Sequence, residues 1–337
     1  MANIKIPAVV FGTSGLGNLY HAPDYGEKKA IVNACVTSSS GITFFDTAGK
    51  YGAGLALEVL GACLKDLNID PDKVLISNKL GWYQTELKGS EPTFEPGVWK
   101  SLKNDAVQRI SYQGILDCFE QGNQLLGDYS AGFVSVHDPD EYLLSAKNER
   151  EKQQRYADII EAYRALNELK SAGKVSAVGI GAKDWKVIRK IAQDVHLDWV
   201  MIANSLTVKS HPKALIQFIE TLEEKNIPVI NSAIFNGGFL TGSEFYNYRQ
   251  IDDGNVDDQA LLSWRLDFFD ICSQYGLLPA EACFNFCTHF SGIKSIAMST
   301  TRVEKVAQNL AMTSKQVPAE FWITMYKKGL IETPIIS

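Results

Sequence analysis

Short apolar runs alternate with longer stretches of helical periodicity along nearly the whole chain. Eight of these runs are brief and lack an alternation of apolar and polar positions, which is typical of strands buried on both faces. They are Ala8–Phe11, Ile42–Phe45, Val74–Ser77, Phe133–Val136, Val175–Val178, Trp199–Ile202, Pro228–Ile230 and Ile293–Ile296.

Between the runs, apolar residues recur at helical spacing. One such stretch carries Ala157, Ile160 and Tyr163 and stops at Gly173, and another begins at Ser111. Strands that alternate with helices predict a parallel sheet, and eight strands are the number that closes a barrel. No shift in composition marks a domain boundary. We therefore predict a single (β/α)8 TIM barrel over residues 1–337.

Two long connections follow strands, Leu80 to about Val98 and Ala233 to about Asp258. They are expected at the C-terminal face of the barrel, where barrel enzymes build their sites. The stretch Pro318–Gly329 is predicted to be helical, packing across the barrel mouth or on its outer wall.

Composition narrows the classes of protein that fit. Of the 337 residues, 45% are hydrophobic and 21% charged, which is ordinary for a globular chain and excludes a disordered one. The net charge is -6 and no basic run occurs, so neither nucleic acid nor an anionic membrane is an expected partner. The stretch Met1–Pro7 lacks the apolar core of a secretory signal, and six cysteines are too few for a disulfide scaffold. We expect a soluble cytoplasmic protein.

Four polar residues come at or just after the ends of successive predicted strands: Asp46, Tyr51, Lys79 and His137. In a barrel they would converge on one mouth. A phenol ordinarily titrates near about 10, and a neighbouring ammonium lowers that value while a carboxylate keeps the ammonium charged. An imidazole beside the phenol can orient a substrate oxygen. Each residue alone would more often be structural, but together they favour proton transfer to or from a hydroxyl or carbonyl.

The same residues lie in segments that resemble a known family. Phe44–Gly52 resembles the strand-two signature of the aldo-keto reductase superfamily, and Ile76–Lys79 and Val134–His137 follow in the order of its Lys and His. Val178–Gly181 and Phe235–Gly242 also correspond, so the resemblance covers most of the chain. It implies that Tyr51 is the general acid/base.

The resemblance also implies roles for the other three residues. Lys79 and Asp46 would tune the phenol, and His137 would orient the substrate oxygen. Metal ligation is not expected, because the two cysteines nearest to a histidine, Cys283 and Cys287, lie at helical spacing in an apolar stretch that is typical of core packing.

A narrower resemblance concerns the substrate. Leu16–Tyr20, Ser111–Gly114, His137–Asp140 and Ile234–Gly238 are similar to the D-threo-aldose 1-dehydrogenase or L-fucose dehydrogenase branch. This similarity implies oxidation of the anomeric hydroxyl of a free aldose to a lactone. The expected substrate contacts are Tyr20, Tyr51, Trp82, His137 and Asp138, with core packing as the alternative for Trp82. Two alternatives remain open: an aldehyde or pyridoxal-type redox enzyme of the same family, and a regulatory barrel that binds the cofactor without turnover. The oligomeric state is not predicted.

The family binds NAD or NADP over the barrel mouth, without a Rossmann domain. The backbone amides of Phe235–Leu240 are expected to face the pyrophosphate, and Ser299–Lys305, which opens a helix, the adenosine end. The implied cofactor contacts are Thr13, Asp46, Asn204, Ser232, Phe235, Asn236, Gly238, Leu240, Ser299, Thr300, Arg302, Lys305, Gln308 and Asn309.

Two departures from the family pattern bear on the cofactor. Gly181 and Ala182 stand where many reductases place Ser-Asn after strand five to grip the carboxamide. Ser299 stands where NADPH-dependent members often place a Lys for the 2′-phosphate. NAD is therefore favoured, although Arg302 and Lys305 could serve a phosphate.

Overall fold

Eight parallel strands form a closed barrel in the computed structural model, which describes residues 5–247 and 249–335. In order around the barrel they are β1 (Val9–Gly12), β12 (Ile293–Ser299), β9 (Val229–Ser232), β8 (Trp199–Ala203), β7 (Ala177–Ala182), β6 (Phe133–His137), β3 (Val74–Leu80) and β2 (Thr43–Ala48). The predicted (β/α)8 barrel is confirmed. Part of the stretch that spoke against a secretory signal, residues 1–4, lies outside the described residues.

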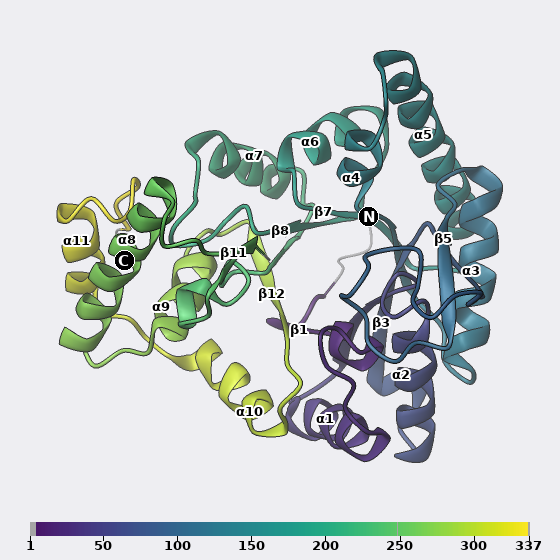
Figure 1. Ribbon diagram of the computed structural model, residues 1–337, viewed down its shortest axis with the longest axis horizontal. Helices are drawn as coiled ribbons and strands as arrows, with labels where there is room; N and C mark the ends of the chain where they lie inside the picture. The colour runs from purple at the N-terminus through teal and green to yellow at the C-terminus, as the bar shows by residue number, and fades with distance from the viewer. Residues whose placement is uncertain (1–4, 248, 336–337) are drawn as a thin grey trace.

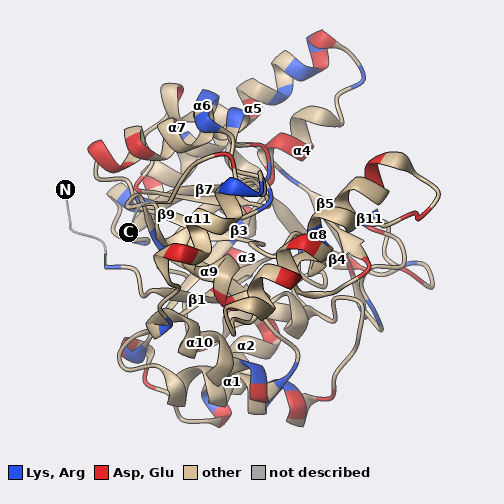
Figure 2. Ribbon diagram, turned by 90° about the vertical axis from the view of Figure 1, so that its left-hand side faces the viewer, with Lys and Arg blue, Asp and Glu red and all other residues tan. Residues whose placement is uncertain are grey.

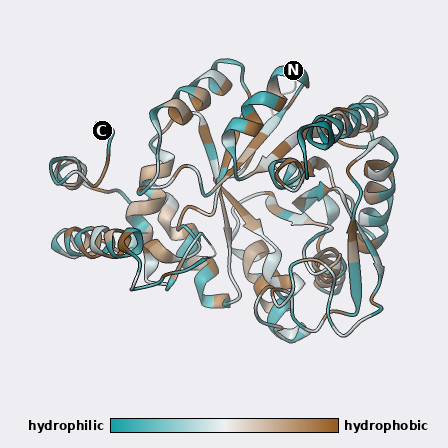
Figure 3. Ribbon diagram, turned by 45° about the horizontal axis from the view of Figure 1, so that its top comes forward, coloured by the Kyte–Doolittle hydropathy of each residue, from teal (hydrophilic) through white to brown (hydrophobic). Residues whose placement is uncertain are grey.

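Helices surround the strands (Figure 1). They are α1 (Tyr25–Ser38), α2 (Leu55–Asp66), α3 (Tyr112–Leu126), α4 (Pro139–Leu144), α5 (Glu149–Ser171), α6 (Trp185–Asp194), α7 (Lys213–Glu224), α8 (Val256–Gln274), α9 (Pro279–Thr288), α10 (Val303–Ala311) and α11 (Ala319–Lys327). Figure 3 shows outer helices banded with hydrophilic and hydrophobic residues, as helices with one buried face should be.

Local signals set several of the helix ends. The Ser111 side chain accepts a hydrogen bond from the Gly114 amide and caps α3, as the sequence predicts. Asp24 caps α1 in the same way by accepting from the Glu27 amide. These caps fix where each helix begins after its preceding loop.

Strand β7 continues past the predicted end at Val178 to Ala182. Gly179 lies inside it, and a Cβ added there would fall 2.2 Å from Cε2 of Trp199 on the neighbouring strand. Glycine weakens a strand on its own account, so the sequence pattern stops early. Here the absent side chain makes room for the indole.

Both long connections contain structure of their own. After β3, the hairpin of β4 (Trp82–Glu86) and β5 (Asn104–Gln108) pairs antiparallel. After β9, β10 (Phe245–Tyr246) and β11 (Arg249–Gln250) form a small second hairpin. Helix α11 packs on the outer wall, where Trp322 contacts Phe286 of α9 with ring centroids 5.9 Å apart.

One end of the barrel is filled by large side chains. Val10, Phe44, Phe133, Trp199 and Ile230 are buried together in a cluster, and each lies at or next to the start of its strand. The phenyl ring of Phe133 meets that of Phe44 at 5.2 Å and the indole of Trp199 at 6.0 Å. This plug leaves the opposite end, at the C-terminal ends of the strands, for a site.

The surface carries both signs of charge. In Figure 2, blue and red residues are interspersed over the helices in view. Among the described residues, no helix combines the length and apolarity needed to cross a bilayer. All six cysteines are buried and unbridged.

Candidate active site

A hollow of about 520 Å³ opens at the C-terminal ends of the barrel strands. Asp46, Tyr51, Lys79 and His137 all line it. The structure therefore brings together the four residues proposed from the sequence. They come from β2, the turn after β2, β3 and β6.

Asp46 and Lys79 form a buried ion pair on adjacent strands. Lys79 Nζ lies 2.5 Å from Asp46 Oδ2, and Ser77 Oγ donates to Asp46 Oδ1 at 2.7 Å. Both carboxylate oxygens are therefore satisfied inside the barrel. Although burial alone would lower the pKa of Lys79, the charges of Asp46 and Tyr51 raise it above its usual value. Lys79 thus stays an ammonium at neutral pH.

Tyr51 sits between Lys79 and His137. Lys79 Nζ lies 4.8 Å from the centroid of the phenol ring. The His137 ring meets it nearly at right angles, with centroids 5.6 Å apart. The turn that carries Tyr51 packs against the loop after β1 with no space to spare: a Cβ added to Gly17 would lie 2.7 Å from the Tyr51 carbonyl carbon. This contact holds the phenol in the hollow.

Burial raises the pKa of Tyr51 to about 12, because desolvation of the phenolate outweighs the stabilising charge of Lys79. The sequence predicted the effect of the ammonium correctly in sign, but burial is the larger contribution. Desolvation, with help from Lys79 and Lys50, lowers the pKa of His137 well below its usual value. At neutral pH the site therefore holds a protonated phenol and a neutral imidazole.

Asp138 adds a carboxylate beside the imidazole. Its Oδ2 lies 3.5 Å from Nε2 of His137, and its backbone takes the left-handed conformation with φ of 44°. Burial raises the pKa of Asp138 to about 6. Asp138 and Tyr20, both proposed as substrate contacts, line the hollow, as Tyr51 and His137 do.

Trp82 packs among aromatic residues next to the hollow. Its indole packs against Phe94 with centroids 5.3 Å apart and lies 5.4 Å from Lys50 Nζ. It is absent from the described residues that line the hollow. Trp82 therefore lies beside Lys50 at the edge of the hollow, and its contact with substrate stays a prediction.

Many of the other residues that line the hollow are small. They are Gly12, Ser14, Gly181, Ala182, Ala203, Ser232, Ala233, Gly237, Gly238, Ala297 and Ser299. Such a floor leaves room for a flat ring beside Tyr51. Directly after β8, the buried Oδ1 of Asn204 has no hydrogen-bond partner among the described residues, and a carboxamide could supply one. These features fit a nicotinamide.

The predicted cofactor contacts divide into two groups. Asp46, Ser232, Phe235, Gly238 and Ser299 line the hollow. The others lie outside its lining among the described residues: Thr13, Asn204, Asn236, Leu240, Thr300, Arg302, Lys305, Gln308 and Asn309. Thr13, for example, donates its hydroxyl to the Asp46 carbonyl at 3.1 Å, which is a structural bond inside the barrel.

The loop expected to hold the pyrophosphate already uses several of its amides. Gly238 N and Leu240 N both donate to the Phe235 carbonyl, at 3.0 and 3.1 Å, and Asn236 N donates to the Ala233 carbonyl. These three amides are therefore engaged within the loop, and the role of the loop toward a pyrophosphate stays a prediction.

The two cationic residues proposed as phosphate ligands, Arg302 and Lys305, lie at the start of α10. Arg302 is exposed at its N-cap, and Lys305 Nζ donates to Gln308 Oε1 at 2.8 Å. Ser299 Oγ, at the end of β12, lies 3.3 Å from Ser14 Oγ. A helix N-terminus flanked by a cation suits phosphate oxygens.

Sequence reasoning missed three residues of the wall beside Tyr51: Lys50, Glu95 and Trp99 all line the hollow. Lys50 immediately precedes Tyr51 in the segment Phe44–Gly52, so the sequence alone could have placed it near the proposed catalytic residue. Glu95 and Trp99 lie in or just after the long connection that follows β3, and nothing in their spacing reveals that this segment folds back over the mouth.

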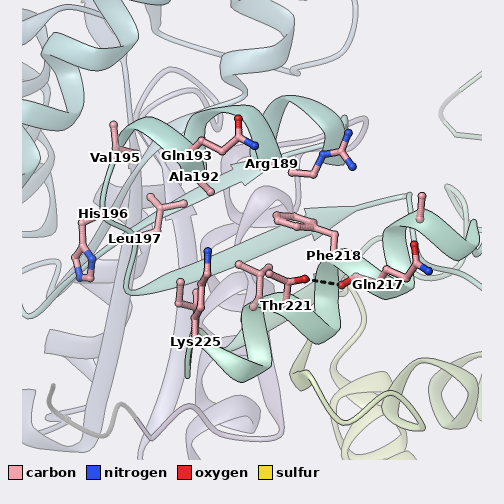
Figure 4. Close-up of a pocket in the computed structure, with 13 residues that line it drawn as sticks. Arg189, Ala192, Gln193, Val195, His196, Leu197, Gln217, Phe218, Thr221 and Lys225 are labelled. Atoms are coloured by element: carbon pink, nitrogen blue, oxygen red, sulfur yellow. Dashed lines mark hydrogen bonds between the residues drawn. The ribbon is translucent and has the colours of Figure 1, made fainter.

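A second groove, of about 420 Å³, lies on the outer wall between α6 and α7 (Figure 4). Its lining includes Arg189, His196, Phe218 and Lys225, and none of the four proposed catalytic residues. His196 and Leu197 precede β8, so the groove lies toward the plugged end of the barrel. Elsewhere too, the described residues contain no group of three His, Cys, Asp or Glu side chains placed to hold a metal.

Comparison with known proteins agrees with this architecture. A model of the "Aldo/keto reductase family" matches residues 8–328. The chain is 25% identical to pyridoxal 4-dehydrogenase of Microbacterium luteolum, over 97% of this chain and 95% of that one. It is also 25% identical to D-threo-aldose 1-dehydrogenase of a Pseudomonas species, over 99% and 97%.

Solved structures give the same fold at lower identity. An aldo-keto reductase of Bacillus halodurans, AKR11C1 in its holo form, superposes with a TM-score of 0.68 at 17% identity and covers 98% of this chain and 94% of its own. The glycerol dehydrogenase AKR11B4 of Gluconobacter oxydans reaches 0.67, also at 17% identity and with the same coverage.

Proposed function

The chain belongs to the aldo/keto reductase family of oxidoreductases, and on that premise we propose that it oxidises the anomeric hydroxyl of a free aldose to the lactone with a nicotinamide dinucleotide. The L-fucose or D-threo-aldose type is the substrate class we favour. The observation that carries the proposal is the convergence of Tyr51, Lys79, Asp46 and His137 on one hollow with a floor of small residues. Full-length similarity to an aldose 1-dehydrogenase supports it.

Each of the four residues has a part in the proposed reaction. The Tyr51 oxygen takes the proton of the anomeric hydroxyl, and the bound dinucleotide supplies the acceptor for the hydride from the anomeric carbon. Lys79 stabilises the phenolate, and Asp46 keeps Lys79 charged and in place. His137, neutral in this site, donates from one ring nitrogen to the sugar oxygen and orients it.

The pKa of Tyr51 sets how the rate of each direction of the reaction depends on pH. With its value raised to about 12, the phenol is protonated at neutral pH and is ready to act as an acid toward a carbonyl. Oxidation needs the phenolate, whose population rises with pH. We therefore expect sugar oxidation to accelerate as the solution becomes more alkaline.

Similarity to pyridoxal 4-dehydrogenase favours a second candidate, oxidation or reduction of an aldehyde or pyridoxal-type substrate at the same site. This second reaction would use the same four residues, and its substrate would replace the sugar in the outer part of the hollow. A regulatory barrel that binds the cofactor without turnover has no use for a phenol, an ammonium and an imidazole in mutual contact, so we place it last.

For the cofactor we propose NAD in preference to NADP. Ser299 presents a hydroxyl, which suits a ribose hydroxyl but does not neutralise a 2′-phosphate. The remaining partner we propose is the small-molecule sugar or aldehyde itself.

The test is a panel of neutral sugars, alcohols and aldehydes with NAD or NADP, followed by the absorbance of the reduced nicotinamide. We expect turnover with at least one free aldose, and a lactone as the product. Turnover confined to aldehydes or pyridoxal would replace the sugar assignment with the second candidate. Tight dinucleotide binding without turnover of any compound would favour the regulatory barrel.

A further inference from the structure

Outside the four polar residues, one wall of the hollow is held by a bridging carboxylate. Lys50 Nζ lies 2.7 Å from Glu95 Oε1. The other oxygen of the same carboxylate, Oε2, accepts a hydrogen bond from Trp99 Nε1 at 2.7 Å. Glu95 therefore joins an ammonium next to Tyr51 in the chain to an indole from a distant segment.

The indole in turn packs on the phenol. The Trp99 and Tyr51 rings have centroids 5.9 Å apart with their planes 34° from parallel. Trp99 is only 6% exposed and also contacts Phe94 at 6.5 Å. A continuous series of contacts thus runs from Lys50 through Glu95 and Trp99 to the ring of Tyr51. We call Lys50, Glu95 and Trp99 the clasp.

The backbone around the clasp is fixed on its other side. Tyr20 N donates to the Val98 carbonyl at 2.9 Å, and Lys100 N donates to the Asn18 carbonyl at 3.0 Å. These two hydrogen bonds therefore join residues 98–100 to the loop after β1. Glu95 itself takes φ of 44°, a left-handed conformation that is unfavourable for a non-glycine residue and persists where surrounding contacts impose it.

The Lys50 ammonium is surrounded by carboxylates and an aromatic ring. Its side chain is 6% exposed, and besides Glu95 it faces Glu141 at 3.3 Å and Asp138 at 3.9 Å, both near or in α4. The Trp82 ring of β4 covers it from another side, and Lys183, after β7, pairs with Glu141. Removing Lys50 would leave the mostly buried Asp138 and the half-buried Glu95 and Glu141 short of a counter-charge, which is costly.

We propose that Lys50 and Glu95 are positioning residues, which hold Trp99 against the Tyr51 ring and so set the wall of the hollow that meets the substrate. The proposal rests on the proposed function in taking Tyr51 as the proton-transfer group. It adds two residues that act through Trp99 and are not themselves expected to exchange protons with the substrate.

The first test is optical and needs no turnover. The chain has six tryptophans, so the signal of Trp99 is isolated by comparing each variant with the same variant carrying Trp99→Phe. Acrylamide quenching of that signal should be weak in the native protein, because the indole is buried. Lys50→Met should raise the quenching toward that of an exposed indole, and Lys50→Arg should restore protection. Lys294→Met, which removes a surface ion pair 3.0 Å long with Glu223, is the matched control and should leave Trp99 unchanged.

The second test is kinetic, with whichever substrate the panel identifies. We expect Lys50→Met to raise KM for the substrate roughly tenfold and to lower kcat, because the phenol is no longer held in register. Dinucleotide affinity should change little, and Lys50→Arg should recover most of the loss. If the Lys50→Met protein does not fold, the double variant Lys50→Met/Glu95→Gln replaces it, because it also removes the carboxylate that Lys50 would have neutralised. Acrylamide quenching of Trp99 should increase in the double variant as well.

Unchanged quenching of Trp99 in a folded Lys50→Met protein would overturn the clasp, as would an unchanged KM. A native enzyme that turns over no compound would defeat the proposed function, and the quenching comparison would still decide the clasp.

Discussion

Charge and burial compete at Tyr51, and their balance decides when the phenol exchanges protons. Burial raises the pKa to about 12, while Lys79 pulls it down and Asp46 pushes it up. Since Lys79 and Asp46 form one ion pair, the net help from the pair is smaller than from an isolated ammonium. The balance is therefore sensitive to single substitutions.

Lys79→Met should raise the pKa of Tyr51 further, because it removes the charge that most stabilises the phenolate. The rate of oxidation should fall by about 10²-fold or more at neutral pH and recover in part as the pH rises. The measurement is kcat/KM against pH, with Ser77→Ala as a control that disturbs Asp46 but keeps the ammonium. A loss that is equal at every pH would mean that Lys79 acts through packing or cofactor contact.

Asp138 should give the site a pH dependence near 6, where burial has moved its pKa. Above about 6 the group is ionised and accepts hydrogen bonds strongly, so KM should rise as pH falls through that value. Asp138→Asn should remove this inflection.

The raised pKa of Asp138 also makes the stability of the folded protein depend on pH. Because the pKa in the folded state is raised, the contribution of Asp138 is fully present below the unfolded value and is lost as pH rises through about 6. Asp138→Asn should therefore raise Tm at pH 8 more than at pH 4. An equal effect at both values would contradict the shifted pKa.

The turns between strands and helices place Tyr51, and one close backbone contact there depends on Gly17. A Cβ on Gly17 would meet the Tyr51 backbone at 2.7 Å, whereas one on Gly41 would meet nothing within 4 Å. Gly17→Ala should displace the Tyr51 turn and cut kcat by about 10²-fold, the scale expected for a misplacement near 1 Å. Gly41→Ala is the matched control and should keep native kcat. Equal activity in the two variants would show that the Tyr51 turn tolerates the shift.

The end of β12 and the start of α10 should set the cofactor preference. We predict about tenfold higher kcat/KM with NAD than with NADP, which corresponds to roughly 1.4 kcal/mol. Ser299→Lys should narrow or reverse the preference by pairing with the 2′-phosphate. Steady-state comparison of both dinucleotides measures it, with Arg302→Ala alongside. A native preference for NADP that Arg302→Ala abolishes would identify Arg302 as the phosphate ligand and refute the interpretation of Ser299.

Strands and helices could largely be predicted from periodicity, but their extensions could not. Apolar runs located all eight barrel strands because buried parallel strands need them. The continuation of β7 through Gly179 depends on the ring of Trp199, and the strands β4 and β5 flank most of a stretch rich in Gly, Pro and Glu that is typical of a loop. These features come from tertiary contacts, which a local pattern does not contain.

Across the barrel, the filled end and the open end explain where chemistry is possible. The cluster around Trp199 closes one end, and the four polar residues occupy the other. Their convergence could be predicted, because the C-terminal ends of parallel strands meet at one face. The clasp could not, since Lys50, Glu95 and Trp99 meet only when the long connection after β3 folds over the mouth.

Tyr51→Phe tests the account most directly. The substitution keeps the ring that packs on Trp99 and His137 and removes the only atom proposed to take the substrate proton. Reduced-nicotinamide absorbance with the best aldose should show a fall in kcat of about 10²–10⁴-fold or more, while dinucleotide affinity, measured by fluorescence titration, stays near the native value. Turnover close to native at neutral pH in this variant would contradict the assignment of Tyr51 as the proton-transfer group.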